Sequence, residues 1–345
     1  MRSMSPSARP EVVGTMAIEN PVLAIENLSV RFPRKAGSIA AVREVSLAVG
    51  AAQCVGIVGE SGSGKTQIFM AAMGLLTGAE VEGSVRFEGR ELLGSARAEL
   101  NRVRGSKLAM IFQDPMTSLT PHLRIGVQLA EVLVSHAQMS WYEAQHAALR
   151  MLERVRVPDP QRRLRQYPHE LSGGMRQRVM IGMSLLCEPT LLIADEPTTA
   201  LDVTVQAQII DILRAMRADS HMAVVLISHD LGVVAGLADR IIVMYAGRVV
   251  EDGTSVEILQ RPAHPYAGEL LKCIPDVRRP RLDRMPSLPG QPPDPSSEEG
   301  GCAFAPRCPR AAPRCRTERP LLRESGTQGH RVACHYPSSD LPFHP

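Results

Sequence analysis

Residues 59–66 have the types and spacing that phosphate chemistry requires, because they match the pattern G-x-x-x-x-G-K-[ST]. In such a loop the backbone N–H groups point at phosphate oxygens, and the helix that follows adds the positive end of its dipole. Lys65 supplies a mobile charge for the β- and γ-phosphates, and the Thr66 hydroxyl is a ligand for Mg²⁺. The expected phosphate-binding residues are Gly59, Ser61, Gly62, Ser63, Gly64, Lys65 and Thr66.

Three further apolar runs each end in polar side chains suited to phosphate hydrolysis. One run ends at Asp195, which is placed to hold Mg²⁺, and at Glu196, which can take a proton from an attacking water. Another ends at His229, and a histidine in such a setting indicates a functional role. A third ends at Gln113, whose side-chain carbonyl can reach a metal or a water.

A second site for an anion is predicted at residues 172–174. Ser172 stands where the N-cap of a helix belongs, and Gly173 and Gly174 allow an anion to approach closely. The apolar helix that follows presents its N-terminus there. One chain with one nucleotide would not need two such sites.

The elements that position these side chains alternate between strands and helices. Strands that each end in polar groups indicate a parallel sheet with its site at the carboxyl edge. Phe32 ends an earlier strand, and its flat apolar face suits either stacking on adenine or packing in the core. The other predicted elements are antiparallel strands at 22–32, 39–49 and 83–88, helices at 122–137 and 141–157, and a hairpin over 240–251.

Composition excludes several classes of protein. The 345 residues are 44% hydrophobic, as expected for a globular protein with a core, and the net charge of +3 is too small to indicate nucleic-acid binding. We find no apolar segment long enough to cross a bilayer and no N-terminal signal sequence. We therefore expect a cytosolic protein, either free or held at a membrane by partners. Three isolated cysteines, Cys54, Cys187 and Cys273, are expected to be small buried residues.

In order and spacing, the motifs resemble those of the nucleotide-binding domain of ABC transporters over residues 22–275. They comprise a Walker A loop at 59–66, a Q-loop at Gln113, a signature at 171–177, a Walker B strand at 191–195 with Glu196, a D-loop ending at Asp202 and an H-loop at His229. The sequences around these motifs, and the segment Cys302-Ala-Phe-Ala-Pro-Arg-Cys308, are similar to the oligopeptide/dipeptide and nickel importer branch.

The resemblance implies an α/β P-loop NTPase fold with a parallel core sheet, an antiparallel β subdomain, a helical subdomain at about 114–186 and a small cysteine-containing C-terminal extension. It also implies that ATP lies between one chain's Walker A loop and a partner's signature. Lys65, Thr66, Asp195 and Gln113 would serve phosphates and Mg²⁺, Glu196 would polarise the water, and His229 would contact the γ-phosphate. Ser172, Gly173 and Gly174 would close on the partner's ATP, and Asp202 would tie the two sites together.

The same resemblance implies partners and a location. A second, related ATPase subunit, two transmembrane permease subunits and an extracytoplasmic solute-binding protein are expected, with this chain peripheral on the cytoplasmic face of the inner membrane. Uptake of di- or oligopeptides is the leading function. Uptake of nickel or another small solute is an alternative, and a soluble non-transport ABC ATPase is another.

The expected domain boundaries are a tail at 1–20, the ATPase domain at 21–275, a linker at 276–300 and the extension at 301–345. The extension holds Cys302, Cys308, Cys315 and Cys334, with gaps of five, six and eighteen residues. These gaps are wider than in usual zinc sites and suit an iron–sulfur cluster. The resemblance supports [4Fe–4S], zinc and metal-free thiols remain alternatives, and His330 and His335 are possible alternative ligands.

Overall fold

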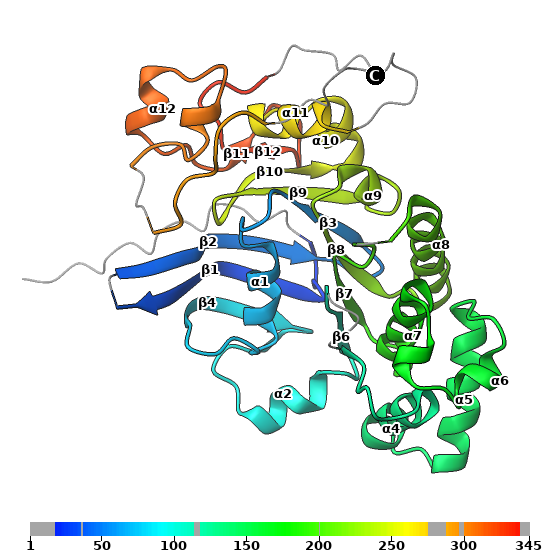
Figure 1. The fold of residues 1–345 in the computed structure, drawn as a ribbon. Coiled ribbons are helices and arrows are strands. Elements are labelled where there is room, and N and C mark those ends of the chain that lie inside the picture. Colours follow the sequence, from blue (N-terminus) through cyan, green and yellow to red (C-terminus); the bar gives the residue numbers. More distant parts are fainter. Residues whose placement is uncertain are drawn as a thin grey trace, which may run out of the picture.

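The computed structural model describes residues 18–35, 37–113, 118–199, 201–274, 288–296 and 300–338. Most of the predicted N-terminal tail, residue 114 of the Q-loop and the arginine-rich part of the linker lie outside these ranges. Within them the chain forms two sheets with helices packed around them (Figure 1). No described helix has the length and apolar character needed to cross a bilayer.

The larger sheet has the strand order β11-β12-β10-β9-β3-β8-β7-β6, and β9, β3, β8, β7 and β6 run parallel. This confirms the predicted parallel sheet. Every residue of these five strands is buried, as expected where both faces are covered. The strands are β3 (Cys54–Val58), β6 (Leu108–Ile111), β7 (Leu191–Asp195), β8 (Ala223–Ser228), β9 (Arg240–Tyr245), β10 (Arg248–Thr254), β11 (Arg323–Glu324) and β12 (Arg331–Val332).

The smaller sheet is antiparallel, with the order β2-β1-β4-β5. Its strands are β1 (Leu23–Arg34), β2 (Gly37–Val49), β4 (Glu80–Phe87) and β5 (Arg90–Glu91). The predicted strands at 22–32, 39–49 and 83–88 are therefore confirmed, with ends displaced by a few residues. Alternate residues of the parallel strands, such as Val55 and Ile57 of β3, share one core with this sheet, whereas Cys54 and Val58 face the other core.

Helices cover the sheets and extend to one side of the molecule, where α4, α5, α6 and α7 form the predicted helical region (Figure 1). The predicted helices at 122–137 and 141–157 are α4 and α5, and Leu129, Leu133 and Leu152 face the core as expected. The α-helices are α1 (Lys65–Ala72), α2 (Arg97–Val103), α4 (Ile125–Ala137), α5 (Trp141–Arg154), α6 (Pro160–Arg163), α7 (Gly173–Leu185), α8 (Val203–Ser220), α9 (Leu231–Ala235), α10 (Ser255–Gln260), α11 (Pro265–Lys272) and α12 (Pro313–Thr317). The 3₁₀ helices are η1 (Pro168–Glu170) and η2 (Ala305–Arg307).

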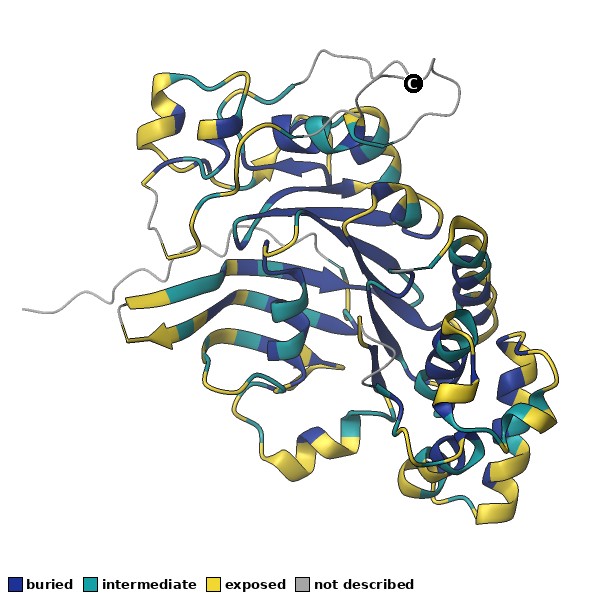
Figure 2. Ribbon diagram, in the orientation of Figure 1, coloured by how far each residue is buried: buried dark blue, intermediate teal, exposed yellow. Residues whose placement is uncertain are grey.

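The C-terminal extension is joined to the ATPase core through the main sheet, because β12 pairs with β10. The buried carboxylate of Asp252 on β10 contacts Arg240 at 2.6 Å and also Arg331 of β12. Arg240 in turn donates to the carbonyl oxygen of Ala48 on β2, at 2.9 Å. Figure 2 shows that the paired strands β9, β10 and β12 are largely buried. Residues 288–296, part of the predicted linker, also lie against folded structure, since Arg43 donates to the carbonyl of Pro295 at 3.0 Å.

Burial of the three isolated cysteines differs from the expectation. Cys54 is fully buried on β3, as predicted, but Cys187 and Cys273 are only partly buried. Both lie just beyond the last residue of a helix, Cys187 after α7 and Cys273 after α11. All seven cysteines lie within the described ranges, and none forms a disulfide.

Gly56 lies at the centre of β3 directly beneath α9, and a Cβ atom there would lie 2.1 Å from Cγ1 of Val234 and 3.2 Å from Cβ of Ala238. We predict that Gly56→Ala destabilises the protein by about 1–3 kcal/mol, because α9 must move away from the sheet. Urea unfolding measures this change. Gly268→Ala is the matched control, since the nearest atom to its added carbon is 3.9 Å away. Equal stability of the two variants would contradict the packing argument.

The junction between core and extension contains a titratable pair, His330 Nε2 and Glu251 Oε1, 2.8 Å apart. Burial alone would lower the pKa of His330, but the hydrogen bond and charge of Glu251 raise it above its ordinary value. The pair therefore contributes stability that is fully present below about pH 6.5 and is lost as the pH rises through the higher folded-state pKa.

We predict that His330→Gln lowers the melting temperature most at pH 5.5–6 and progressively less toward pH 9, for the reason just given. Thermal unfolding of both proteins across this range measures the difference. His122→Gln, at an exposed histidine, should leave the melting temperature unchanged at every pH. A difference for His330→Gln that does not vary with pH would show that the pair does not titrate.

Candidate functional site

The phosphate loop connects β3 to α1, as the sequence predicts. Lys65 is buried, and its ammonium donates to the carbonyl oxygens of Gly59 at 2.7 Å and Glu60 at 2.8 Å. Burial lowers the pKa of Lys65, and neighbouring carboxylates oppose this shift. The loop thus holds a cation against its own carbonyls, from which it can turn to a phosphate.

Gly64 shows why this loop needs glycine. Its φ is +92°, a left-handed conformation, and a Cβ atom would lie 2.2 Å from the carbonyl oxygen of Ala41. The backbone N–H of Gly247 also donates to the carbonyl of Ser63 at 3.1 Å. The loop is therefore packed against β2 and against the turn between β9 and β10, with its backbone geometry set by these neighbours.

The strand ends bring the predicted metal ligands together. The Thr66 hydroxyl, in the first turn of α1, donates to Oδ1 of Asp195 at the end of β7, over 3.1 Å. Burial raises the pKa of Asp195, and the hydrogen bond from Thr66 opposes this. Two oxygen ligands side by side at a phosphate loop match the chemistry of Mg²⁺, which prefers oxygen and substrate phosphates. The residues present therefore fit this ion.

The other predicted catalytic side chains lie around the carboxylate of Glu196. Its Oε2 accepts from Gln113 Nε2 at 3.0 Å and from the Thr199 hydroxyl at 2.8 Å, and its Oε1 lies 3.2 Å from His229 Nδ1. Burial alone would raise its pKa, but hydrogen bonds from Thr199 and His229 hold the pKa of Glu196 below its ordinary value. Glu196 thus remains a carboxylate at neutral pH, the state that a general base requires.

Two helix starts complete the predicted motifs without joining this group. Ser172 caps α7 by accepting from Met175 N at 3.3 Å, as predicted, and Asp202 caps α8 by accepting from Val205 N at 3.0 Å. Within the described part of the chain, no hydrogen bond connects Ser172 to the side chains around Lys65 and Glu196. Gly174 lies against α8, where an added Cβ would meet Val205 at 3.2 Å. Gly173 is exposed at the same helix start, with open space around it.

Phe32 lies on β1 opposite Ile39 of β2 and is partly buried against the core of the antiparallel sheet. This position is compatible with both sequence interpretations, so adenine stacking stays a prediction. Sequence reasoning missed Thr199 and Gln177. Thr199 lies three residues after Glu196, in the turn that follows β7, and Gln177 donates from α7 to the carbonyl of Pro197 at 2.5 Å. The only sequence signal for these two residues was their position, because Gln177 ends the signature at 171–177 and Thr199 lies between Glu196 and the D-loop.

The four C-terminal cysteines lie around one small cavity, which His264 and His335 also line. Burial raises the pKa of the Cys302 thiol to about 11, although a hydrogen bond from the backbone of Phe304 lowers it. Backbone N–H groups of Arg310 and Tyr336 also reach the sulfurs of Cys308 and Cys334.

Among the described residues no three His, Cys, Asp or Glu side chains are arranged to hold a single metal ion. Of the two alternative ligands, His330 instead pairs with Glu251 at the junction with β10 and does not line the cysteine cavity. His335 does line the cavity, and its buried Nδ1 has no hydrogen-bond partner among the described residues.

Comparison with known proteins identifies two matching family models. The first, described as ABC transporter, covers residues 42–199, and the second, described as oligopeptide/dipeptide transporter, C-terminal region, covers residues 250–315. The oligopeptide transport ATP-binding protein OppD of Salmonella typhimurium is 48% identical to this chain over 93% of it and 96% of the relative. A putative peptide import ATP-binding protein of Brucella abortus is 45% identical over 93% of this chain and 97% of the relative.

Solved structures also match the fold. The dimeric post-hydrolysis structure of the ATP-binding cassette MJ0796, bound to ADP and Pi, superposes with a TM-score of 0.62 at 27% identity. It covers 68% of this chain and 98% of the solved one. The share left uncovered is consistent with the sequence expectation of a C-terminal extension beyond the cassette.

Proposed function

We propose a function for this chain on the premise that it belongs to the ABC transporter family and carries the C-terminal region of its oligopeptide/dipeptide transporters. It is the ATP-hydrolysing subunit of a peptide importer. The observation that supports this conclusion is the C-terminal region of oligopeptide/dipeptide transporters, which follows a complete set of cassette motifs in this chain. The whole chain also matches peptide-transport relatives over almost their whole length.

In the proposed mechanism, ATP binds with its phosphates along the loop at 59–66 and its Mg²⁺ held by Thr66 and Asp195. Lys65 turns from the loop carbonyls to the β- and γ-phosphates. When bound there, Mg²⁺ would neutralise charge at the phosphate oxygens. Glu196, which is ionised and fixed by its neighbours, accepts a proton from the attacking water, and His229 contacts the γ-phosphate.

A second ATPase subunit completes the site. Ser172 and Gly174 lie at a separate helix start, a placement that supports closure of each signature on the partner's nucleotide. Asp202, at the start of α8, is the proposed link between the two sites. The dimeric state of the solved ATP-binding cassette supports the pairing of two such subunits.

We further propose that two permease subunits and an extracytoplasmic solute-binding protein complete the importer. The ATPase would then lie at the cytoplasmic face of the membrane. Gln113 touches Glu196 and precedes the helical region of α4 and α5, so it is placed to sense nucleotide and pass the change to the permeases.

We also propose that Cys302, Cys308, Cys315 and Cys334 hold a [4Fe–4S] cluster. Four thiols around one cavity supply the full ligand set, and backbone N–H groups directed at three of the sulfurs would stabilise thiolates. His264 offers a further fit. Its Nδ1 accepts from the N–H of Tyr266 at 3.0 Å, and burial lowers its pKa to about 3, so the neutral ring carries its proton on Nε2. That buried N–H has no acceptor among the described residues and lies on the cysteine cavity.

For hydrolysis, we predict that Glu196→Gln keeps ATP binding and lowers turnover by about 100-fold or more, because the amide cannot accept the proton. The assay is ATPase activity of the importer reconstituted with its permeases and binding protein. Glu188→Gln, at an exposed carboxylate before the same strand, should leave activity unchanged. Normal turnover in Glu196→Gln would refute the role of this residue. Stimulation of the wild-type complex by peptides, and not by nickel, is the result expected for a peptide importer.

For the cysteines, we predict about four iron and four sulfide per chain after anaerobic purification, as a cubane cluster requires. Cys302→Ser should lose most of this iron, whereas Cys187→Ser, at a cysteine outside the group, should keep it. Metal and acid-labile sulfide analysis measures both. Stoichiometric zinc without iron would show that the cysteines form a structural zinc site instead of an iron–sulfur cluster. A folded chain with no metal would contradict the proposal.

A further inference from the structure

Arg307 of the extension reaches into the phosphate loop. Its Nη1 and Nη2 donate to the two carboxylate oxygens of Glu60 at 2.7 and 2.9 Å, a bidentate ion pair. The Arg307 side chain is only 4% exposed. Its remaining contacts are to the Tyr245 hydroxyl at 3.2 Å and, through Nε, to the carbonyl of Pro289 at 2.8 Å. The guanidinium is therefore buried with acceptors for all three nitrogens, the condition under which such a pair is stable.

Glu60 is also held through its backbone. Its N–H donates to the hydroxyl of Tyr266 at 2.9 Å, and its carbonyl accepts from Nζ of Lys65 at 2.8 Å and from the N–H of Ser63 at 3.1 Å. Arg307 therefore contacts one of the two residues whose carbonyl oxygens hold the ammonium of Lys65, the other being Gly59. A shift of Glu60 would displace both Lys65 and the N–H groups of the loop.

The segment that presents Arg307 lies between two of the four cysteines. The short helix η2 starts at Ala305, directly after Phe304, and ends at Arg307, immediately before Cys308. The N–H of Ala305 donates to the carbonyl of Cys302 at 2.9 Å. Phe304 is buried, with its ring centroid 5.3 Å from those of Tyr245 and Tyr266. One turn, bounded by Cys302 and Cys308, therefore inserts an aromatic ring and a guanidinium into the core.

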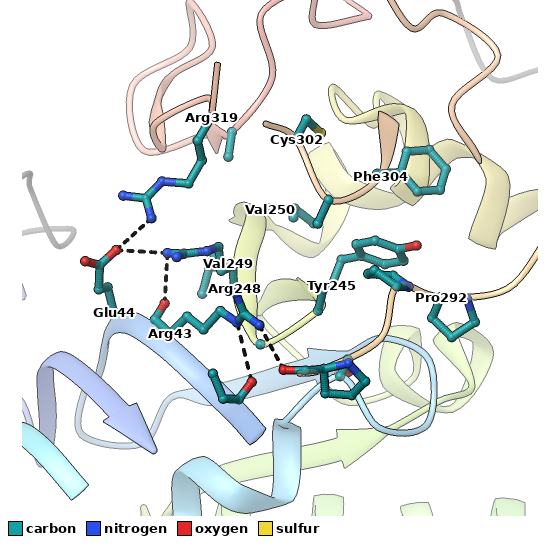
Figure 3. A pocket seen from close by; sticks show the side chains of 18 of the residues that line it. Arg43, Glu44, Tyr245, Arg248, Val249, Val250, Pro292, Cys302, Phe304 and Arg319 are labelled. Carbon is teal, nitrogen blue, oxygen red and sulfur yellow. Dashed lines mark hydrogen bonds and ion pairs between the residues drawn. The ribbon is translucent and has the colours of Figure 1, made fainter. Parts of the chain in front are cut away.

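Elsewhere the extension and the loop are separated by a cavity of about 760 Å³, shown in Figure 3. Residues 60–63 of the loop line one part of it, and Phe304 and Arg319 of the extension line another. Arg319 crosses to Glu44 of β2 at 3.0 Å, beyond the loop. Because this cavity lies between them, the extension does not pack continuously against the loop. Individual side chains make the contact, and Arg307 makes its ion pair.

We propose that Arg307 is a positioning residue for the phosphate loop, through which the four-cysteine extension sets the affinity of the ATP site. The inference rests on the proposed function. Glu60 places a negative charge in a loop built to bind anions, and Arg307 neutralises that charge while fixing the backbone that carries it. A turn held at Cys302 and Cys308 keeps Arg307 in place. Loss of order at the cysteines would therefore weaken nucleotide binding.

The test is the binding of Mg-ADP to the full-length chain by calorimetry, since ADP is not consumed. We predict that Arg307→Met weakens binding about tenfold, the effect of losing one charge-assisted contact and exposing the loop to the Glu60 carboxylate. Arg307→Lys, which keeps the charge and loses the fork, should fall between Arg307→Met and wild type. The double variant Glu60→Gln/Arg307→Met should recover most of the affinity, because it removes the uncompensated charge.

Coupling to the cysteines is tested by Cys308→Ser. It should weaken Mg-ADP binding in the wild-type chain and have no further effect in the Arg307→Met background. Arg314→Met is the matched control, because it breaks an exposed arginine–glutamate pair, with Glu318, in the same extension. It should bind Mg-ADP like wild type. The melting temperature of each variant establishes that the chain is folded, and its iron content shows whether the cysteines still hold the cluster.

Three results would overturn the inference: unchanged affinity in Arg307→Met, a double variant as weak as the single one, or additive effects of Cys308→Ser and Arg307→Met. A wild-type chain that binds no nucleotide would instead refute the proposed function. The two failures are therefore distinguishable in one set of titrations.

Discussion

Burial of the parallel strands on both faces is the constraint on which the rest of the structure depends. Because these strands have no solvated face, polar side chains can stand only at their ends, and parallel pairing brings the carboxyl ends to one edge. Thr66, Asp195, Glu196 and His229 therefore meet although they come from distant parts of the sequence. Neighbouring groups then shift one another's pKa values, and the hydrogen bonds to Glu196 keep its carboxylate ionised despite burial.

The same geometry supports the proposal that a partner subunit completes the site. Ser172 and Asp202 cap the starts of α7 and α8, and among the described residues no hydrogen bond connects Ser172 to the side chains around Lys65 and Glu196. Such a helix start can bind an anion, which is the basis for proposing that it closes on the nucleotide of a partner subunit. An ATPase that works only when two such surfaces close is suited to driving a conformational change in a membrane complex.

The extension is an integral part of this fold rather than an appended module. Its strand β12 extends the main sheet, and Arg331 shares the buried carboxylate of Asp252 with Arg240, which also reaches β2. A buried charge shared in this way is costly to separate, because removing one partner leaves another uncompensated. A change in the structure of the extension therefore alters the stability of the core. Through the contact between Arg307 and Glu60, it also alters the position of the phosphate loop.

By itself, the sequence determined the motif chemistry, the parallel sheet, the antiparallel strands and most helix positions, because glycine spacing, strand-end carboxylates and apolar periodicity are local signals. It also identified the four cysteines as a group. Only the tertiary structure decided that Thr199 holds Glu196, that His330 pairs with Glu251 instead of lining the cysteine cavity, and that Arg307 grips Glu60. The last two contacts join residues more than 70 positions apart in the chain. All three depend on side-chain geometry, which no local pattern of residue types encodes.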